Sequence, residues 1–241
     1  MERGMLPESV VRFGIRKQVQ ARLKSEKKRL DKIYNMKLSH FTTMLKKNPI
    51  AVETDAANDQ HYMVNSDFFK LCLGSHLKYS ACYFPDGVKT LDEAELASLK
   101  QVANRAQIQD GQNVLELGCG WGSFSLWAAQ NYPNSNFTGV SNSSSQREFI
   151  ETKIKELNLT NLKIITTDIN ELNLNDSFDR IVSIEMFEHM RNYELLLNKI
   201  SGLLNENGKL FVHVFSHKEF AYLFESDNSW MAKYFFTGGL M

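Results

Sequence analysis

The sequence predicts an α/β fold in which a doubly wound, mostly parallel sheet follows an N-terminal helical lobe. Three observations support this fold. Short apolar runs alternate with helical patterns after residue 110, as in successive βαβ units. The stretch near the N-terminus has helical periodicity with Lys and Arg between its apolar positions. A length of 241 residues with 43% hydrophobic residues suits one compact core with an appended lobe. We predict residues 1–75 as the helical lobe and cap, and residues 76–241 as the core.

The elements follow from local patterns taken along the chain. Apolar residues recur at helical spacing over residues 8–44, and Pro49 with its polar neighbours ends that pattern. Residues 91–108 form an amphipathic helix, with Thr90 as its N-cap and acidic residues in its first turn. Strands and helices then alternate. The strands are expected at residues 113–118, 135–141, 162–168, 178–186 and 208–215, and the helices between them at 122–132, 145–158 and 193–204.

Composition excludes several classes of protein. The net charge is zero, but about a dozen Lys and Arg face only four acidic residues in the first 50 positions. We interpret this basic lobe as solvated helices that cover a site, with approach to anionic lipid as an alternative. No nucleic-acid motif accompanies the charge, so no nucleic-acid partner is expected. Three irregularly spaced cysteines argue against a disulfide framework. No apolar stretch reaches the roughly 18 residues of a membrane span, so we predict a soluble, cytoplasmic protein.

A glycine-rich loop follows the first predicted strand. In "VLELGCGWGSFSL", residues 114–126, glycines 118, 120 and 122 allow a tight turn and a close approach to a ligand at a helix N-terminus. The spacing is G-x-G-x-G, whereas dinucleotide sites use G-x-G-x-x-G. Glu116 lies inside the strand just before the loop, where a carboxylate can help to hold an amino-acid-like ligand. Cys119 and Trp121 are expected to be packing residues.

A second constellation follows the fourth predicted strand. In "IVSIEMFEHM", the apolar strand ends and Glu185, Glu188 and His189 follow within five positions. Spacings of three and four place these side chains near one face of a helical turn. Carboxylates beside an imidazole shift its pKa, as catalytic sites require. A capping and surface ion pair is the structural alternative. No metal site is predicted.

The chain resembles the class I S-adenosylmethionine-dependent methyltransferases, and within them the cyclopropane-fatty-acid synthase superfamily. Inside that superfamily it is most similar to the coclaurine-type N-methyltransferases. The resemblance covers the chain from about residue 77 to its end. It is carried, in order, by "LKYSACYF", "LDEAE", "RAQIQDGQ", "LGCGWGSFSL", "GVSNSSSQREFI", "SIEMFEHMRNYELLL", "FVHVFSHKEFAY" and "YFFTGGLM".

The resemblance implies S-adenosyl-L-methionine as the methyl donor and assigns the residues that bind it. Tyr79 and Ser80 would close over its methionine end, although an aromatic packing cluster is the alternative for Tyr79. Asp168 would accept from the adenine amino group, or serve only as a turn residue, and Ile169 would lie against the ring. Asn142 is also a candidate N-cap. The loop and ribose positions carried over are Gly118, Gly120, Gly122, Ser141, Asn142 and Gln146.

The resemblance also implies the catalytic set. Lipid cyclopropane synthases resemble "SIEMFEHM" but often carry Gly in place of Glu185, and they hold a bicarbonate with the positions of Glu188 and His213. The amine N-methyltransferases keep the first glutamate. A carboxylate there attracts an ammonium group, and the Glu–His set accepts the proton that leaves before the nitrogen attacks. The catalytic residues expected are therefore Glu185, Glu188, His189 and His213, whereas His217 is expected to be structural.

Three functions follow from these expectations. The first is S-adenosylmethionine-dependent methyl transfer to the nitrogen of a small cyclic or aromatic amine. The second is transfer to an unsaturated lipid acyl chain, with a membrane surface as partner. The third is a shortened, non-catalytic cofactor-binding protein. Homo-oligomer formation is a further alternative that the sequence leaves open.

The last expectation concerns the C-terminal end of the sheet. The resembling families continue past "YFFTGG" into two more strands, so the chain is expected to be a C-terminally shortened member. The sheet would then keep an exposed edge, with reduced stability or a need for a partner. The aromatic residues after the fifth strand form either a cation–π wall or a core stripe: Phe220, Tyr222, Phe224, Trp230, Tyr234, Phe235 and Phe236.

Overall fold

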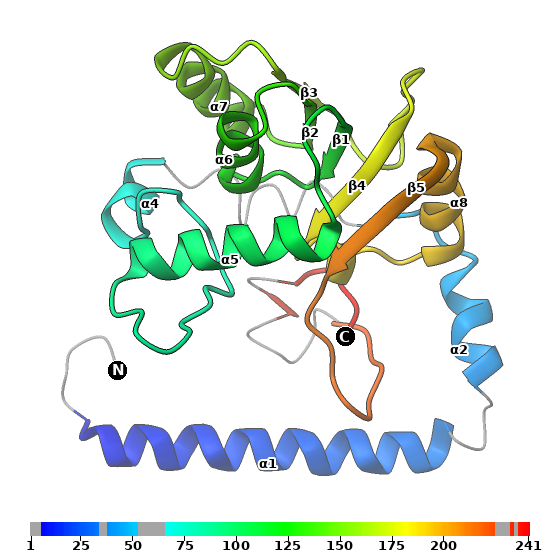
Figure 1. The fold of residues 1–241 in the computed structure, drawn as a ribbon. Coiled ribbons are helices and arrows are strands. Elements are labelled where there is room, and N and C mark those ends of the chain that lie inside the picture. The colour runs from blue at the N-terminus through cyan, green and yellow to red at the C-terminus, as the bar shows by residue number, and fades with distance from the viewer. Residues whose placement is uncertain (1–5, 34–37, 53–65, 225–231, 234–235) are drawn as a thin grey trace.

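The computed structural model describes residues 6–33, 38–52, 66–224, 232–233 and 236–241. A parallel sheet lies at its centre, with strands in the order β3-β2-β1-β4-β5 (Figure 1). This arrangement confirms the predicted fold class. Chain order reverses on either side of β1, and ligands on such sheets bind at the carboxyl ends of the strands beside this reversal. The strands are β1 (Asn113–Leu117), β2 (Asn136–Ser141), β3 (Leu162–Thr166), β4 (Phe178–Ile184) and β5 (Leu204–His213).

Helices cover both faces of the sheet because its strands present apolar side chains to both sides. Val114 and Val182 pack into the cluster beneath three helices on one face, whereas Leu115 and Ile181 pack into the cluster beneath one helix on the other. This double winding was predicted. The first face carries α5 (Leu91–Ala106), α6 (Ser123–Asn131) and α7 (Ser144–Glu156), and the second carries α8 (Tyr193–Leu203).

Two local expectations have different outcomes. Thr90 caps α5 as predicted, since its side chain accepts from the Glu93 N–H and the Glu93 carboxylate accepts from the Thr90 N–H. Strand β5 begins at Leu204, four positions before the predicted start. Leu204 pairs with Phe178, and pairing resumes only at Lys209 opposite Arg180. A bulge in β5 therefore absorbs the polar residues that made this stretch look like a loop.

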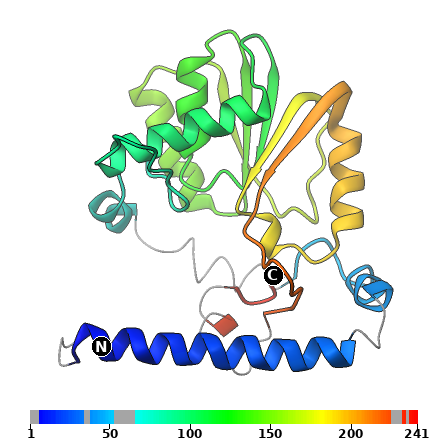
Figure 2. The same cartoon turned by 60° about the horizontal axis from the view of Figure 1, so that its bottom comes forward.

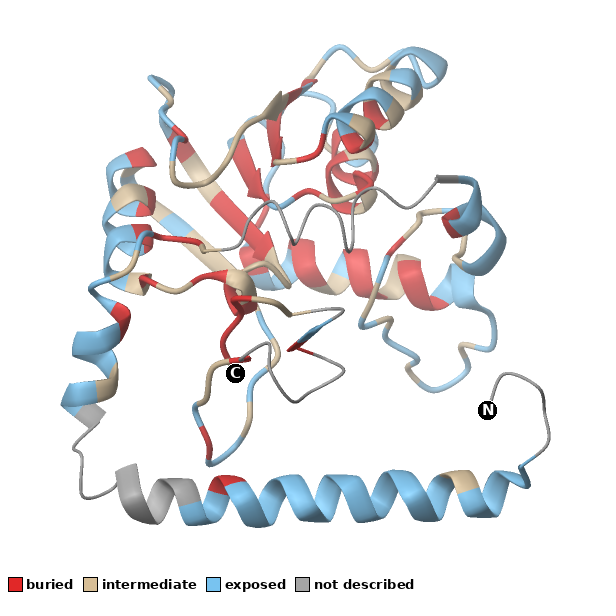
Figure 3. Ribbon diagram, turned by 180° about the vertical axis from the view of Figure 1, so that it is seen from behind, coloured by how far each residue is buried: buried red, intermediate tan, exposed pale blue. Residues whose placement is uncertain are grey.

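The N-terminal part contains α1 (Glu8–Ile33), α2 (Leu38–Leu45) and α4 (Ser66–Cys72). Helix α1 runs along the base of the molecule and is exposed over nearly all its described length (Figures 2 and 3). The sequence patterns gave no signal for α4. Ile50 and Ala51 are buried against the second face of the sheet, so part of the predicted lobe packs into the core. The proposed boundary at residue 75 stays a prediction.

The C-terminal segment folds back onto the carboxyl end of β4. The Leu240 N–H donates to the Glu188 carbonyl at 2.7 Å, and the Met241 N–H donates to the Tyr222 carbonyl at 2.8 Å. Trp230, Tyr234 and Phe235 lie outside the described residues. No helix in the described ranges is both long and apolar enough to cross a membrane.

Candidate active site

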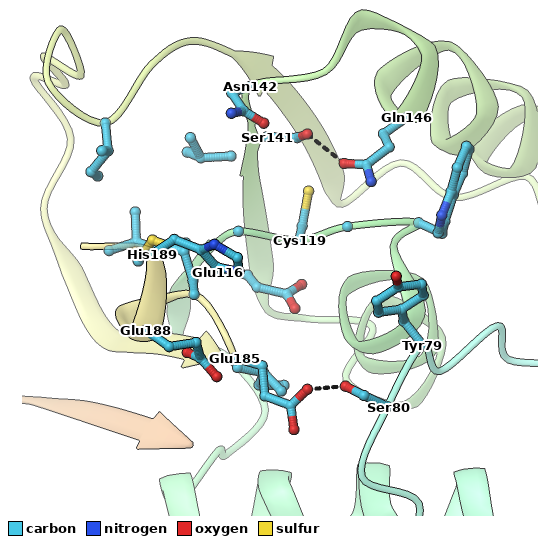
Figure 4. Close-up of a pocket in the computed structure, with 18 of the residues that line it drawn as sticks. Tyr79, Ser80, Glu116, Cys119, Ser141, Asn142, Gln146, Glu185, Glu188 and His189 are labelled. Atoms are coloured by element: carbon cyan, nitrogen blue, oxygen red, sulfur yellow. Dashed lines mark hydrogen bonds between the residues drawn. The ribbon is translucent and has the colours of Figure 1, made fainter. Parts of the chain in front are cut away.

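A cavity of about 330 Å³ opens at the carboxyl ends of β1, β2 and β4 (Figure 4). It brings together thirteen of the fifteen residues predicted for the site, which come from sequence positions up to 110 residues apart. Cofactor-end and catalytic-end residues share one continuous lining. The thirteen are Tyr79, Ser80, Glu116, Gly118, Gly120, Ser141, Asn142, Gln146, Asp168, Ile169, Glu185, Glu188 and His189.

The other two predicted residues do not line this cavity. Gly122 is the N-cap of α6 with φ 80°, and a Cβ there would lie 2.8 Å from Cγ1 of Ile150. It therefore allows α6 and α7 to approach each other. The His213 side chain also lies outside the lining, but its carbonyl accepts the Glu185 N–H at 2.7 Å. His213 thus fixes the backbone of a predicted catalytic residue.

The glycine loop leaves room for a ligand. Gly118 and Cys119 donate their N–H groups to the Val140 carbonyl at 2.9 and 3.0 Å, which ties the loop to β2. A Cβ on Gly118 would lie 2.9 Å from the Met186 side chain, whereas a Cβ on Gly120 would meet no atom within 4 Å. Cys119 is buried as expected for packing, yet it also lines the cavity, as does Trp121.

Glu116 is a buried acid at the inner end of β1. Its carboxyl group accepts a hydrogen bond from the Ser125 hydroxyl on α6. Burial raises its pKa to about 8, although Ser125 and the nearby Lys78 charge oppose that rise. Without a ligand, Glu116 is therefore mostly protonated at neutral pH.

This raised pKa predicts a pH dependence of stability. The folded protein binds the Glu116 proton up to about pH 8, whereas the unfolded chain loses it near the ordinary glutamate pKa of 4.5. The free energy of unfolding of the ligand-free protein should therefore fall as pH rises from about 5 to about 8. Denaturant titrations should show a shallower fall for Glu116→Gln and an unchanged one for Glu148→Gln, an exposed control on α7. An unchanged slope in Glu116→Gln would assign the effect elsewhere.

Polar groups at the end of β2 are already organised. The Ser141 hydroxyl donates to the side-chain carbonyl of Gln146 at 2.7 Å, and both residues are buried (Figure 4). Their remaining hydroxyl and amide capacity suits a sugar hydroxyl. Ser143, rather than Asn142, caps α7. Asp168 accepts the Asn170 N–H at 2.7 Å, so it is a turn residue as well as a lining residue.

Hydrogen bonds to a carboxylate of α5 hold the segment that carries Tyr79 and Ser80. The fully buried carboxylate of Glu95, on α5, accepts three backbone N–H groups of this segment, at 2.8 to 3.1 Å. Leu77 and Ala81 have φ 49° and 52°, so a left-handed residue lies on each side of the pair. The Tyr79 ring packs edge-on against Phe69 of α4 at 5.4 Å while it lines the cavity. The packing interpretation of Tyr79 is therefore confirmed, and its closure over the cofactor stays a prediction.

Glu185 has an unfavourable backbone conformation at the end of β4. Its φ is 52°, in the left-handed region that costs a residue with a side chain about 1 kcal/mol or more. Its carboxylate accepts a hydrogen bond from the Ser80 hydroxyl, which joins the two ends of the cavity (Figure 4). Strain of this kind persists where a site needs the side chain. A glycine would adopt this φ without strain.

Glu188 is the most deeply buried acid at this end, with 1% of its surface exposed. Among the residues that the structure describes, none makes a hydrogen bond of normal geometry to either carboxylate oxygen. Burial raises its pKa to about 7, and the Glu185 charge adds to the rise, while backbone N–H groups including that of Phe215 oppose it. Glu188 can thus exchange a proton at neutral pH.

The spacing of Glu185, Glu188 and His189 suggested one shared helical face, but the structure does not place them on one α-helix. Only Glu188 and His189 belong to a short 3₁₀ turn, Phe187–His189, and Glu185 precedes it in the left-handed conformation. The His189 ring stacks on Phe236, with centroids 5.4 Å apart. Phe215 also packs on Phe236, and both phenylalanines line the cavity. We call Phe215 and Phe236 the aromatic wall.

Among the charged residues that line the cavity, one buried residue was not predicted. Lys78 is only 4% exposed and lines the cavity beside Tyr79. A lysine in a predicted loop is ordinarily solvated, so its type gave no signal. Only its position next to the carried-over Tyr79 pointed to the site. His217, expected to be structural, accepts the N–H groups of Glu219 and Phe220 and stacks on the Phe220 ring.

Comparison with known proteins agrees with this geometry. Residues 51–241 match the mycolic acid cyclopropane synthetase family. The chain is 43% identical over 243 residues to (S)-coclaurine N-methyltransferase of Thalictrum flavum subsp. glaucum, a match that spans all of this chain and 67% of that protein. It is 32% identical over 184 residues to cyclopropane-fatty-acyl-phospholipid synthase of Escherichia coli (strain K12), covering 76% of this chain and 46% of that protein.

A solved structure extends the likeness to three dimensions. It is a crystal structure of coclaurine N-methyltransferase bound to N-methylheliamine and S-adenosylhomocysteine (SAH). It superposes with a TM-score of 0.88 at 40% sequence identity, over 99% of this chain and 70% of that one. This chain therefore spans about two thirds of the length of its coclaurine N-methyltransferase relatives.

Proposed function

This chain belongs to the mycolic acid cyclopropane synthetase family, and from that premise we propose that it transfers a methyl group from S-adenosyl-L-methionine to the nitrogen of a small cyclic or aromatic amine. The relatives with the higher identity are amine N-methyltransferases, and the cyclopropane synthase is more distant. One observation carries the proposal. Glu185 and Glu188 both line the cavity, as do the two rings of the aromatic wall.

The cofactor end fits S-adenosylmethionine. No atom lies within 4 Å of a Cβ placed on Gly120, which leaves space for the ligand beside the loop, and the Ser141–Gln146 pair offers polar groups to ribose hydroxyls. Asp168 and Ile169 supply an acceptor and an apolar surface for a purine. When it is bound, the sulfonium of this cofactor supplies an already activated methyl group. The work left to the protein is then to orient the acceptor and to manage its proton.

The catalytic end suits an amine. The Glu185 carboxylate, fixed by Ser80, attracts a protonated nitrogen to the cavity. Glu188, with a pKa of about 7, takes the proton that must leave before the lone pair attacks. The aromatic wall favours the cationic form of the amine through cation–π contact. His189, stacked on Phe236, closes this end and orients the wall.

A methylation assay tests the proposal. We expect mass spectrometry to show a gain of one methylene on bicyclic secondary amines incubated with the protein and S-adenosylmethionine. Vesicles of unsaturated phospholipid in parallel test the lipid alternative. Lipid modification without amine methylation would overturn the proposed acceptor, and no transfer to either would overturn the activity of this chain.

The glycine loop gives a matched prediction for cofactor binding. Gly120→Arg should abolish calorimetric binding of SAH and lower the melting temperature by about 2–4 °C, because the new side chain enters open space but the backbone has φ 52°. Gly122→Val should lower the melting temperature further, because its side chain also meets Ile150. SAH binding by Gly120→Arg at wild-type affinity would place the cofactor elsewhere.

A further inference from the structure

Lys78 is a buried lysine whose position is fixed from two sides. Its backbone N–H donates to Glu95 at 3.1 Å, and its ammonium donates to the Ser80 carbonyl at 2.6 Å. The residue is 4% exposed and lines the same cavity as Glu116. Its charge reaches Glu116, because it lowers the pKa of that acid.

This ammonium has no anionic partner in the described part of the chain. No carboxylate lies within 4.0 Å of its nitrogen, and its one hydrogen bond goes to a neutral carbonyl. The Glu95 carboxylate below is already occupied by three backbone N–H groups. A buried cation in this state is costly unless an anion joins it. Two of its three N–H donors remain for such an anion.

We propose that Lys78 binds the α-carboxylate of the amino-acid end of S-adenosylmethionine, while Glu116 serves the α-ammonium of the same end. This inference rests on the proposed function and names the subsite that binds the zwitterionic amino-acid end of the cofactor. The two residues come from different elements, the segment before α5 and strand β1, and they present an ammonium group and a buried carboxyl group to the same cavity. A zwitterion satisfies both buried groups at once, which neither a nucleoside nor an amine alone does.

A purely structural role for Lys78 makes a different prediction. The ammonium could serve only to tether the Ser80 carbonyl in a segment with left-handed residues on each side. In that case, loss of the lysine would weaken the binding of every adenosine ligand alike. If Lys78 instead binds the carboxylate, its loss would weaken the binding only of ligands that carry this group. The test must therefore remove the carboxylate from the ligand as well as the lysine from the protein.

Calorimetric titration with two ligands separates these roles. SAH is compared with its decarboxylated analogue, which lacks only the carboxylate. In the wild-type protein we expect SAH to bind roughly 10- to 100-fold more tightly, as for a charge-assisted hydrogen-bonded pair. In Lys78→Met this preference should disappear, while affinity for the analogue stays near the wild-type value. Lys78→Gln, which keeps an N–H donor for Ser80, should also lose the preference, and exposed Lys100→Met should keep it.

Each outcome decides the matter. Equal wild-type affinity for both ligands would overturn the subsite while leaving cofactor binding intact. A parallel loss of both affinities in Lys78→Met and Lys78→Gln would make Lys78 a tether only. If the wild-type protein binds neither ligand, the proposed function and this inference fail together. The wild-type comparison needs no variant, so it stands even where a substitution impairs folding.

Discussion

Glu188→Gln is expected to lower the rate of amine methylation by about two to four orders of magnitude, as loss of a general base does. The substitution keeps the shape of the side chain and removes its capacity to take a proton. Because the substitution leaves the glycine loop unchanged, SAH affinity should stay close to that of the wild type. Single-turnover rates together with calorimetry would measure both quantities.

The pH profile makes this prediction specific. Burial and the Glu185 charge raise the pKa of Glu188 to about 7, so the active, ionised form grows as pH rises through 7. The wild-type kcat/KM should therefore rise over this range, and Glu188→Gln should lose that limb. Glu194→Gln, an exposed control paired with Lys46, should keep it. An unchanged limb in Glu188→Gln would assign the titration to the substrate amine or to another group.

The parallel sheet could be predicted because its signals are local. Apolar runs such as residues 113–117 and 178–184 fix the strands, and the capping box at Thr90 fixes the start of α5. The glycine loop could be placed because a strand precedes it and a helix follows it. What local patterns cannot supply is the contact between distant segments. The meeting of Ser80 with Glu185 joins positions 105 residues apart, and no periodicity in either segment encodes it.

The misplaced details have physical causes. His213 was predicted as a cavity residue from the family resemblance, but the side chains of a strand point alternately to opposite faces, and that of His213 does not line the cavity. Gly122 belongs to the motif, yet its missing side chain makes room for Ile150 rather than for a ligand. Lys78 was overlooked because a lysine predicts exposure, and only the folded chain shows that it is buried. The left-handed conformation of Glu185 was equally invisible, since glutamate does not favour it.

Glu185→Gly is expected to stabilise the protein while it removes most of the amine methylation. At φ 52°, glycine relieves about 1 kcal/mol of backbone strain, which corresponds to a rise of about 2–4 °C in melting temperature for a chain of this size. The same change removes the carboxylate that attracts the ammonium and the partner of the Ser80 hydroxyl. We expect kcat/KM for amines to fall by about two orders of magnitude, as for loss of a part-buried, charge-assisted contact.

Two further variants divide this result into its parts. Glu185→Gln keeps the strained backbone and a hydrogen-bond acceptor for Ser80, so it should lose activity without gaining stability. Asn158→Gly, at φ 52° after α7 and outside the cavity lining, should be stabilised slightly or not at all and should keep full activity. If Glu185→Gly methylates amines as fast as the wild type, the carboxylate has no role in the reaction, and the strain at this position would have no functional reason. If it loses both activity and stability, the Ser80 contact outweighs the strain, and Glu185 holds the cavity together as well as binding the amine.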